Sequence, residues 1–298
     1  MSNTKIIEHE FEYLVPASVE DALSKLSRGN AKLLAGGTDL IVRLKMGAVE
    51  PDYVVDISRL NDLVFISRSS EGCEIGAGVK LSSVERERYI LENYPALAEA
   101  VHSIGGTQVR NMGTIVGNLC NASPGADSAP PLLVYGTEVE ILGLAQDGRV
   151  SGRKVSLEEF FVGPGKTVLK ANELVSKIII PIPPENSSSA FRKIARVTLD
   201  ISKISCAVYF ENNDGKFRNV RIAFGATAAR PIRVLGIEEM LNGEKVGMEI
   251  VGKVAKRVVS EISPITDVRS TAEYRREVAP VLFKDTFEIA LKRLKGEN

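Results

Sequence analysis

The chain has 298 residues, of which 44% are hydrophobic and 26% are charged, a composition typical of globular proteins and not of disordered ones. Its 38 basic and 38 acidic side chains balance, which argues against nucleic acid as a partner, and no apolar run is long enough to span a membrane. Three scattered cysteines predict neither a disulfide framework nor a cysteine-bound metal, and an amino terminus unlike a signal or transit peptide predicts a cytoplasmic protein.

The first part of the chain predicts a mixture of helices and strands. Ser18, with Asp21 three residues later, is typical of a helix start, and Gly29 is typical of the stop that follows. Strands are expected at 32–35, 53–57 and 73–79, and helices at 81–93 and 96–103. The stretch 105–131, rich in glycine and proline, is expected to be mostly loop.

Two further strands, at 138–142 and 174–180, precede the best candidate for a linker. That candidate is the segment 181–189, which begins with prolines and ends with serines. Its position predicts a first domain at 1–180 and a second at 190–298, both of mixed α and β structure.

The second domain opens with a hairpin signal. Asp214-Gly215 predicts a tight turn between strands at 205–211 and 217–226. Helices are expected at 235–241, 248–262 and 271–294, and Pro280 is expected to kink or divide the last of them.

The segment 33–40, with the sequence LLAGGTDL, is the first with a functional signal. Gly36 and Gly37 follow an expected strand, so main-chain amides can approach a ligand closely and form a concavity that binds anions. Thr38 adds a hydroxyl donor. The alternative is an ordinary strand–turn–helix junction with Asp39 near the helix start.

The segment 110–127 is the second, and it holds three Asn, one Thr, one Ser and one Asp among small residues. Uncharged donors beside a single carboxylate suit a polyhydroxylated, phosphate-bearing ligand better than a metal. A solvated loop is the alternative, but such loops seldom contain so few Lys and Glu residues. We expect no metal site, because His9 and His102 are the only histidines.

Taken together and in this order, these segments resemble the FAD-binding (medium) subunit of the molybdenum hydroxylases, the family of xanthine dehydrogenase and carbon monoxide dehydrogenase. The segment 35–40 resembles the first FAD loop of that family, and 109–118 resembles its second. The turn at 163–167 and the stretches 189–193 and 270–276 resemble three further motifs, so the similarity covers essentially the whole chain.

The resemblance implies an α+β fold. Its first domain would be an FAD-binding domain of the vanillyl-alcohol-oxidase type, with subdomains at about 1–57 and 58–180. The linker 181–189 would lead to a carboxy-terminal α+β domain at 190–298, with an antiparallel sheet of three or more strands and helices.

The resemblance also implies a set of residues that bind FAD without a covalent bond, and no catalytic side chain. The pyrophosphate and adenosine side would be bound by Leu33, Leu34, Ala35, Gly36, Gly37, Thr38, Asp39 and Leu40. The remaining phosphate and the ribityl oxygens would be bound by Thr114, Ile115, Val116, Gly117, Asn118, Asn121 and Ser123. The flavin ring would be contacted by or lie near Asp127, Ile104, Leu174 and Lys193.

The function implied is electron transfer within a larger enzyme. The chain would pass electrons from [2Fe–2S] clusters on a small partner subunit, through FAD, to NAD, a quinone or another acceptor. A large partner subunit would hold molybdopterin, and the assembly would be a dimer of heterotrimers. The alternatives are a stand-alone FAD-dependent oxidoreductase and a non-redox assembly subunit that lost FAD. The last rests on Val116, where the family usually has Gly, because a β-branched residue resists positive φ.

Overall fold

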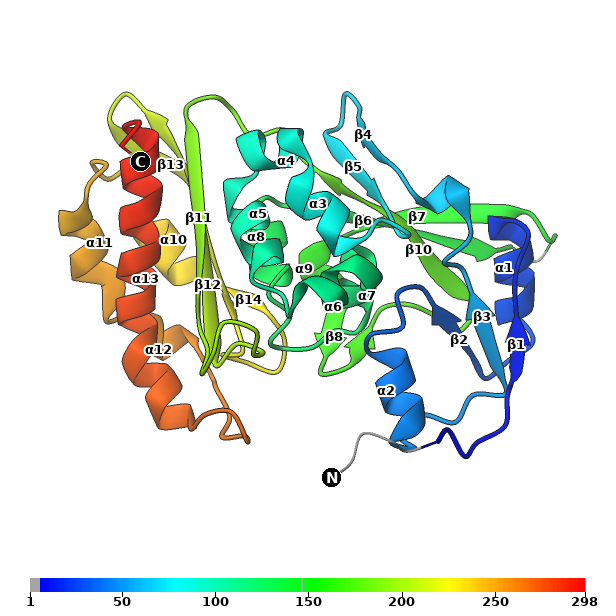
Figure 1. Ribbon diagram of the computed structural model, residues 1–298. Coiled ribbons are helices and arrows are strands. Elements are labelled where there is room, and N and C mark those ends of the chain that lie inside the picture. Colours follow the sequence, from blue (N-terminus) through cyan, green and yellow to red (C-terminus); the bar gives the residue numbers. More distant parts are fainter. Residues whose placement is uncertain (1–5, 146, 298) are drawn as a thin grey trace.

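The computed structural model describes residues 6–145 and 147–297. In Figure 1 the carboxy-terminal sheet lies at the left, a layer of short helices in the middle and the amino-terminal sheets at the right. None of the helices within these described ranges is both long and apolar enough to cross a membrane.

The amino-terminal sheet is small and parallel, with the strand order β1-β3-β2. Its strands are β1 (Glu12–Leu14), β2 (Ala31–Leu34) and β3 (Tyr53–Asp56), joined through α1 (Val19–Leu26) and α2 (Leu40–Lys45). Ser18 caps α1 as expected, because its hydroxyl accepts a hydrogen bond from the Asp21 N–H at 3.2 Å. The first segment with a functional signal is therefore the connection from β2 to α2.

The second sheet is antiparallel, with the order β4-β5-β10-β6-β7. Its strands are β4 (Ile66–Arg68), β5 (Cys73–Gly76), β6 (Glu138–Leu144), β7 (Val150–Ser156) and β10 (Glu173–Ile180). A two-stranded ribbon of β8 (Phe161–Gly163) and β9 (Lys166–Thr167) follows the helix α9 (Leu157–Phe160). The strand expected at 73–79 ends at Gly76 and is therefore shorter than predicted.

Six short helices fill the middle of the molecule: α3 (Leu81–Arg86), α4 (Arg88–Asn93), α5 (Pro95–His102), α6 (Thr107–Met112), α7 (Ile115–Cys120) and α8 (Ala129–Val134). The expectation of loop over 105–131 was wrong, since α6, α7 and the start of α8 lie there. Thr114 caps α7, and Pro130 and Pro131 stand in the first turn of α8, where a missing N–H costs no helical hydrogen bond. Tertiary burial of these helices outweighs their low intrinsic helix propensity.

The carboxy-terminal sheet is antiparallel, with the order β11-β12-β13-β14. Its strands are β11 (Ser187–Ile194), β12 (Ile204–Asn213), β13 (Lys216–Gly225) and β14 (Ile232–Arg233). The hairpin prediction is confirmed, with positive φ at Asp214 (51°) and Gly215 (76°). β11 begins at Ser187, so the end of the expected linker is part of this sheet.

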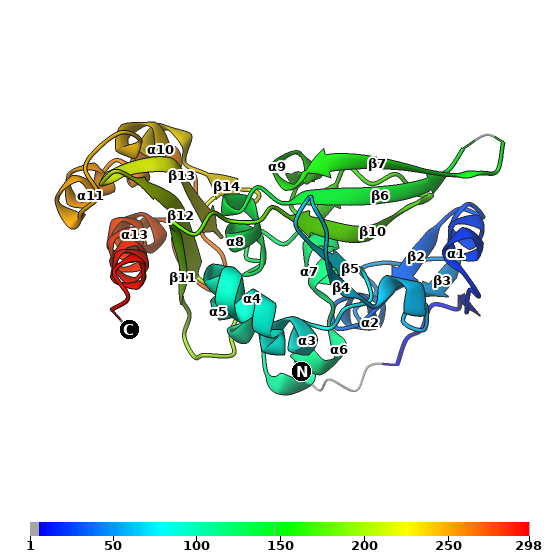
Figure 2. The same ribbon diagram turned by 90° about the horizontal axis from the view of Figure 1, so that it is seen from above.

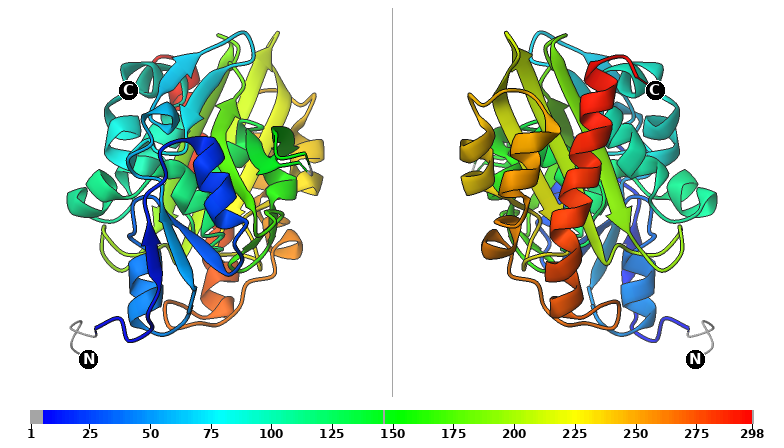
Figure 3. Two further views of the ribbon diagram at one scale, coloured as in Figure 1. Left: turned by 90° about the vertical axis from the view of Figure 1, so that its right-hand side faces the viewer. Right: turned by 90° about the vertical axis from the view of Figure 1, so that its left-hand side faces the viewer.

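The helices of the carboxy-terminal part are α10 (Leu235–Leu241), α11 (Met248–Ala255), α12 (Val258–Glu261) and α13 (Ala272–Leu294). Figure 3 shows α13 crossing one face of the sheet, and Figure 2 shows α5 and α8 on the other face. We expected Pro280 to kink or divide this helix, and the structure shows that it does not divide it. Proline removes only the hydrogen bond to the Arg276 carbonyl, and the buried neighbours Ala279 and Phe283 keep the helix on the sheet.

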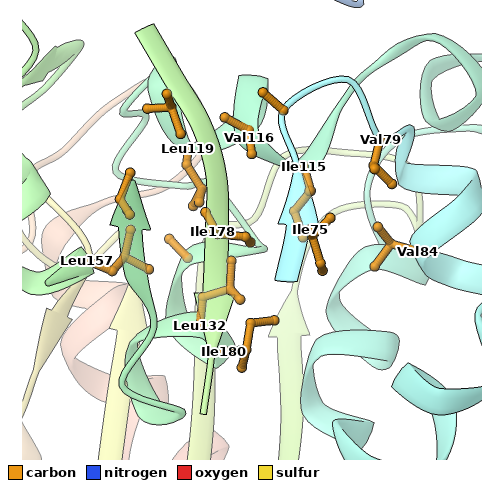
Figure 4. Close-up of a cluster of buried hydrophobic side chains, with 14 of the residues drawn as sticks. Ile75, Val79, Val84, Ile115, Val116, Leu119, Leu132, Leu157, Ile178 and Ile180 are labelled. Carbon is orange, nitrogen blue, oxygen red and sulfur yellow. The ribbon is translucent and has the colours of Figure 1, made fainter. Parts of the chain in front are cut away.

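The buried apolar residues form two clusters that meet at the carboxy-terminal sheet. Along β12, Cys206 and Val208 pack into the cluster under α13, whereas Ala207 and Tyr209 pack into the larger amino-terminal cluster. Figure 4 shows part of that larger cluster, where helix α7 packs beside Ile178 of β10. Because this sheet is buried on both faces, the two parts of the chain share their core.

Candidate functional site

A cleft of about 970 Å³ separates the small parallel sheet from the central helices. Most of its wall comes from four stretches of the chain: 30–43, 104–127, 162–175 and 199–201. Both segments with a functional signal therefore face the same space. Its volume is at the upper end of the range that proteins use for cofactors and other small ligands.

The first segment supplies free main-chain donors to the cleft. The N–H groups of Gly36, Gly37 and Thr38 donate to no main-chain carbonyl among the described residues. Gly37 has a φ of +72°, which a side chain would resist. Gly36 lies against the end of α6, where an added Cβ would collide with the Met112 carbonyl oxygen. These two glycines thus allow the donors to line the cleft and the two segments to touch.

The second segment meets the first through a direct hydrogen bond. Asn121 Nδ2 donates to Asp39 Oδ1 at 3.1 Å, across 82 positions of sequence. Thr114 Oγ1 accepts from the Gly117 N–H at 3.0 Å and so begins α7. Asn118 is oriented by Ser128, whose hydroxyl donates to Asn118 Oδ1 at 2.7 Å. The polar side chains of this segment are therefore held in place by one another.

Val116 fits this arrangement without strain. It lies in the first turn of α7, and its φ is not positive. Its side chain is 4% exposed and packs beside Ile115 and Leu119 in the core, as Figure 4 shows. The reason for suspecting a subunit that lost FAD is removed, because a right-handed helix accepts a β-branched residue.

A buried ion pair lies at the wall of the cleft. Lys193 Nζ on β11 lies 2.9 Å from Asp127 Oδ2, and their side chains are 9% and 6% exposed. Lys193 also donates to the main-chain oxygens of Ser103 (2.7 Å) and Asp200 (3.1 Å), and Ser202 donates to Asp127 Oδ1. Burial raises the pKa of the Asp127 carboxyl, and Lys193 and Ser202 offset only part of that rise.

Most of the expected FAD-binding residues line the cleft. These are Leu33, Ala35, Gly36, Gly37, Thr38, Asp39, Leu40, Ile104, Thr114, Val116, Gly117, Asn118, Asn121, Ser123 and Asp127. Four do not: Ile115 and Leu174 are fully buried, Leu34 is half-buried, and Lys193 reaches the site through Asp127. A sequence pattern places a residue near a ligand but does not say whether it points to the ligand or to the core.

Four basic residues of the cleft wall were missed: Lys32, Arg43, Lys166 and Lys170. None of them forms an ion pair with a described acidic side chain. Lys166 could have been found, because it stands in the glycine-rich turn 163–167. Lys32, Arg43 and Lys170 carry no local signal, since their approach to one another depends on the fold.

The residues present fit an FAD. Free main-chain amides and unpaired cations suit a diphosphate, Asn and Thr side chains suit hydroxyl groups, and apolar residues such as Ile104 suit a flavin ring. Among the described residues, no group of three or more His, Cys, Asp or Glu side chains is placed to hold a metal ion. Fold and site together define an FAD-binding protein of α+β structure.

The chain belongs to the family of FAD-binding domains in molybdopterin dehydrogenases, which matches residues 9–183. A second family, the carboxy-terminal domain of carbon monoxide dehydrogenase flavoproteins, matches residues 189–290. The expected fold class is confirmed, as is the family resemblance drawn from the motifs. The chain is thus the flavoprotein subunit of a molybdenum hydroxylase.

Named relatives match over nearly their full lengths. The glyceraldehyde dehydrogenase medium chain of Sulfolobus acidocaldarius is 32% identical over 280 residues, covering 94% of this chain and 98% of that protein. The xanthine dehydrogenase FAD-binding subunit of Escherichia coli O157:H7 is 32% identical over 285 residues, covering 94% and 96%. Carbon monoxide dehydrogenase from Hydrogenophaga pseudoflava has a similar structure, with a TM-score of 0.91, 29% identity and coverage of 97% and 99%.

Proposed function

We propose that the cleft binds one FAD without a covalent bond, through the segments 33–40 and 114–127. The observation that carries this proposal is the row of main-chain N–H groups at Gly36, Gly37 and Thr38, which have no main-chain acceptor among the described residues. Half-buried N–H groups of this kind are suited to an anionic acceptor, and the oxygens of a diphosphate supply several. Lys32, Arg43, Lys166 and Lys170 supply the opposing charge.

FAD, when bound, supplies a ring that exchanges electrons one or two at a time. The residues of the chain bind, orient and shield it. Ile104, Leu199 and Ile201 give one part of the cleft an apolar wall, and the Lys193–Asp127 pair fixes that wall to β11. The chain then links an iron–sulfur partner to an external electron acceptor.

The proposal includes two partner subunits, a large one with molybdopterin and a small one with [2Fe–2S] clusters, assembled as a dimer of heterotrimers. It is supported by the names of relatives, which are medium chains or FAD-binding subunits of dehydrogenases. It also includes a cytoplasmic location, which is supported by the three free cysteines at positions 73, 120 and 206.

Binding of FAD is tested on the purified full-length chain by its visible absorbance and by thermal unfolding with added FAD. We expect flavin absorbance, and a stabilisation that is larger for FAD than for riboflavin, because the diphosphate carries most of the recognition. Arg43→Gln should weaken FAD binding about tenfold, the effect of losing one charged hydrogen bond, and spare riboflavin. Lys45→Gln is the matched control, since Lys45 is exposed on the same helix and does not line the cleft.

A chain that carries no flavin and gains no stability from added FAD would contradict the proposal. The partners are tested separately, by purifying the chain from its native host and measuring molybdenum and iron in the same fractions. A chain that elutes alone, without either metal, would contradict the assembly but not the binding of FAD.

A further inference from the structure

A second cavity of about 450 Å³ lies between the central helices and the carboxy-terminal sheet. It shares no lining residue with the flavin cleft. Its apolar wall is formed by Leu133, Leu157 and the run from Pro181 to Pro184. Tyr135 and Tyr209 add aromatic surface, with their ring centroids 5.9 Å apart. Nothing in the flavin function uses this space.

Arg221 of β13 is the unusual residue of this cavity. Its side chain is half-buried, yet no carboxylate of a described residue lies within 4.0 Å of it. Among the described residues it donates two hydrogen bonds, to Asn219 Oδ1 at 3.2 Å and to the Val134 carbonyl at 3.4 Å. Arg110, by contrast, is buried and paired with Glu85 at 2.8 Å. Burial, and then the nearby charge of Arg233, lower the pKa of Arg221.

Gly136 makes room for this guanidinium. Gly136 lies directly against Arg221 Nη1, where an added Cβ would collide, and its φ is +72°. Thr137 also lines the cavity, and its Oγ1 is buried with no partner among the described residues. The Arg221 guanidinium thus has N–H donors on the cavity wall that lack an acceptor among the described residues.

The other charges of the wall restrict what the acceptor can be. Arg233 is paired with Glu238 and, at 3.4 Å, with Glu158, so its charge is already matched. Glu211 is held by the Tyr209 hydroxyl at 2.9 Å and by Asn219 Nδ2 at 2.8 Å, and its negative charge remains. Glu158 and Glu211 would repel a multiply charged phosphate more strongly than a singly charged carboxylate, and the Arg221 guanidinium has N–H donors free for one such group.

We propose that this second cavity binds a carboxylate carried on a small apolar or aromatic body, with Arg221 as its counter-ion. The carboxylate accepts from the guanidinium, and the apolar body lies against the tyrosines and the segment 181–184. The carboxylate comes either from a free organic acid or from an acidic side chain of a partner subunit. Both sources use the same chemistry.

The test uses benzoate as the probe and benzamide as its neutral counterpart, each titrated into the purified full-length chain by calorimetry. We expect benzoate to bind and benzamide not to bind. Arg221→Gln should weaken benzoate at least about tenfold, the loss expected for a charged hydrogen bond. Arg218→Gln is the matched control, because Arg218 is exposed on the same strand and does not line the cavity.

Retained FAD and cooperative thermal unfolding show that a variant is folded. Gly136→Ala provides a second variant, which displaces the guanidinium without removing its charge and should also weaken benzoate. The two sources are separated in the complex with partner subunits. If the carboxylate is a free acid, benzoate binds the complex and Arg221→Gln leaves assembly unchanged; if it belongs to a partner, benzoate does not bind the complex and Arg221→Gln weakens assembly about tenfold.

Two results would overturn the inference. One is benzoate binding that is the same in the Arg221→Gln chain as in the unaltered chain. The other is the absence of benzoate binding together with assembly that Arg221→Gln does not change.

Discussion

At the scale of single residues, the flavin cleft depends on close approach between distant parts of the chain. Gly36 sits against the main chain at Met112 and Gly113, where the Gly113 Cα would lie only 2.6 Å from an added Cβ. The Asn121–Asp39 hydrogen bond joins the same two segments at their other end. The geometry of the cleft is therefore fixed by contacts that leave no space for even one methyl group.

Gly36→Ala is expected to separate the two segments and to weaken FAD binding. Backbone atoms are the obstacle, so the cost should be that of overpacking, about 1–3 kcal/mol in the free energy of unfolding. FAD affinity is measured by titration and stability by urea unfolding. Gly252→Ala is the control, since nothing lies within 4 Å of that position, and it should keep its affinity. Normal affinity in Gly36→Ala would contradict the proposed role of this contact.

The Asp127–Lys193 pair makes a second prediction, and its sign follows from burial. The raised pKa means that folded Asp127 keeps its proton at a pH where the unfolded chain has released it. Its contribution to stability therefore falls as pH rises from the ordinary Asp value through the raised folded value. Lys193→Met leaves the buried Asp127 carboxylate without a counter-ion. It should lower the free energy of unfolding by about 3–5 kcal/mol near neutral pH.

The stability lost in Lys193→Met should be smaller at acidic pH, because the unpaired Asp127 can then bind a proton. Urea unfolding of Lys193→Met and the unaltered chain at pH 8 and pH 5 measures the difference. Arg192→Met, at an exposed neighbouring position, is the control and should change little at either pH. An equal loss at both pH values would show that the pair does not act through charge.

At the scale of elements, short helices held by tertiary packing build the site. α6 and α7 have six residues each, too few to be stable alone, and α7 begins at the Thr114 cap. Ile115 and Leu119 anchor α7 in the core while Gly117 and Asn118 face the cleft. A helix thus presents donors that a mobile loop would not hold in place.

The long helix α13 contains a proline whose replacement should stabilise the protein. Pro280 lies inside the helix and leaves the Arg276 carbonyl without its donor. Pro280→Ala should restore that hydrogen bond and raise the free energy of unfolding by about 1–2 kcal/mol, after allowance for the more flexible unfolded chain. Chemical unfolding measures it. Val281→Ala, at a half-exposed position, should change stability little, and a less stable Pro280→Ala chain would contradict the interpretation.

At the scale of the whole molecule, the two parts of the chain complete each other. The larger core cluster includes Phe191, Ala207, Tyr209 and Ala223 from the carboxy-terminal sheet. The segment 199–201 lines the flavin cleft. We therefore propose that the expected domains at 1–180 and 190–298 are not independent folding units.

A fragment that ends at residue 183 tests this proposal. Without the carboxy-terminal sheet it exposes part of its core and loses one wall of the cleft, so it should bind a hydrophobic dye and retain no FAD. The full-length chain, purified in the same way, is the control. A fragment that unfolds cooperatively and binds FAD as tightly as the full-length chain would show that the domains are independent.

Local signals in the sequence predicted the features that depend on neighbouring residues. The Ser18 cap and the Asp214-Gly215 turn are of this kind, because their geometry is decided within a few positions of the chain. The two segments with a functional signal were found from their composition, although their geometry depends on distant contacts. The resemblance of those segments to a known family supplied the cofactor.

Only the tertiary structure decided the features that depend on distant contacts. The helices within 105–131 form because they are buried, and α13 passes Pro280 because the sheet holds it. Arg43 and Lys170 meet in one cleft, and Arg221 faces a second cavity, through the packing of elements far apart in sequence. No local sequence pattern predicts such contacts between distant elements, since the free energy that produces them comes from burying surfaces against one another.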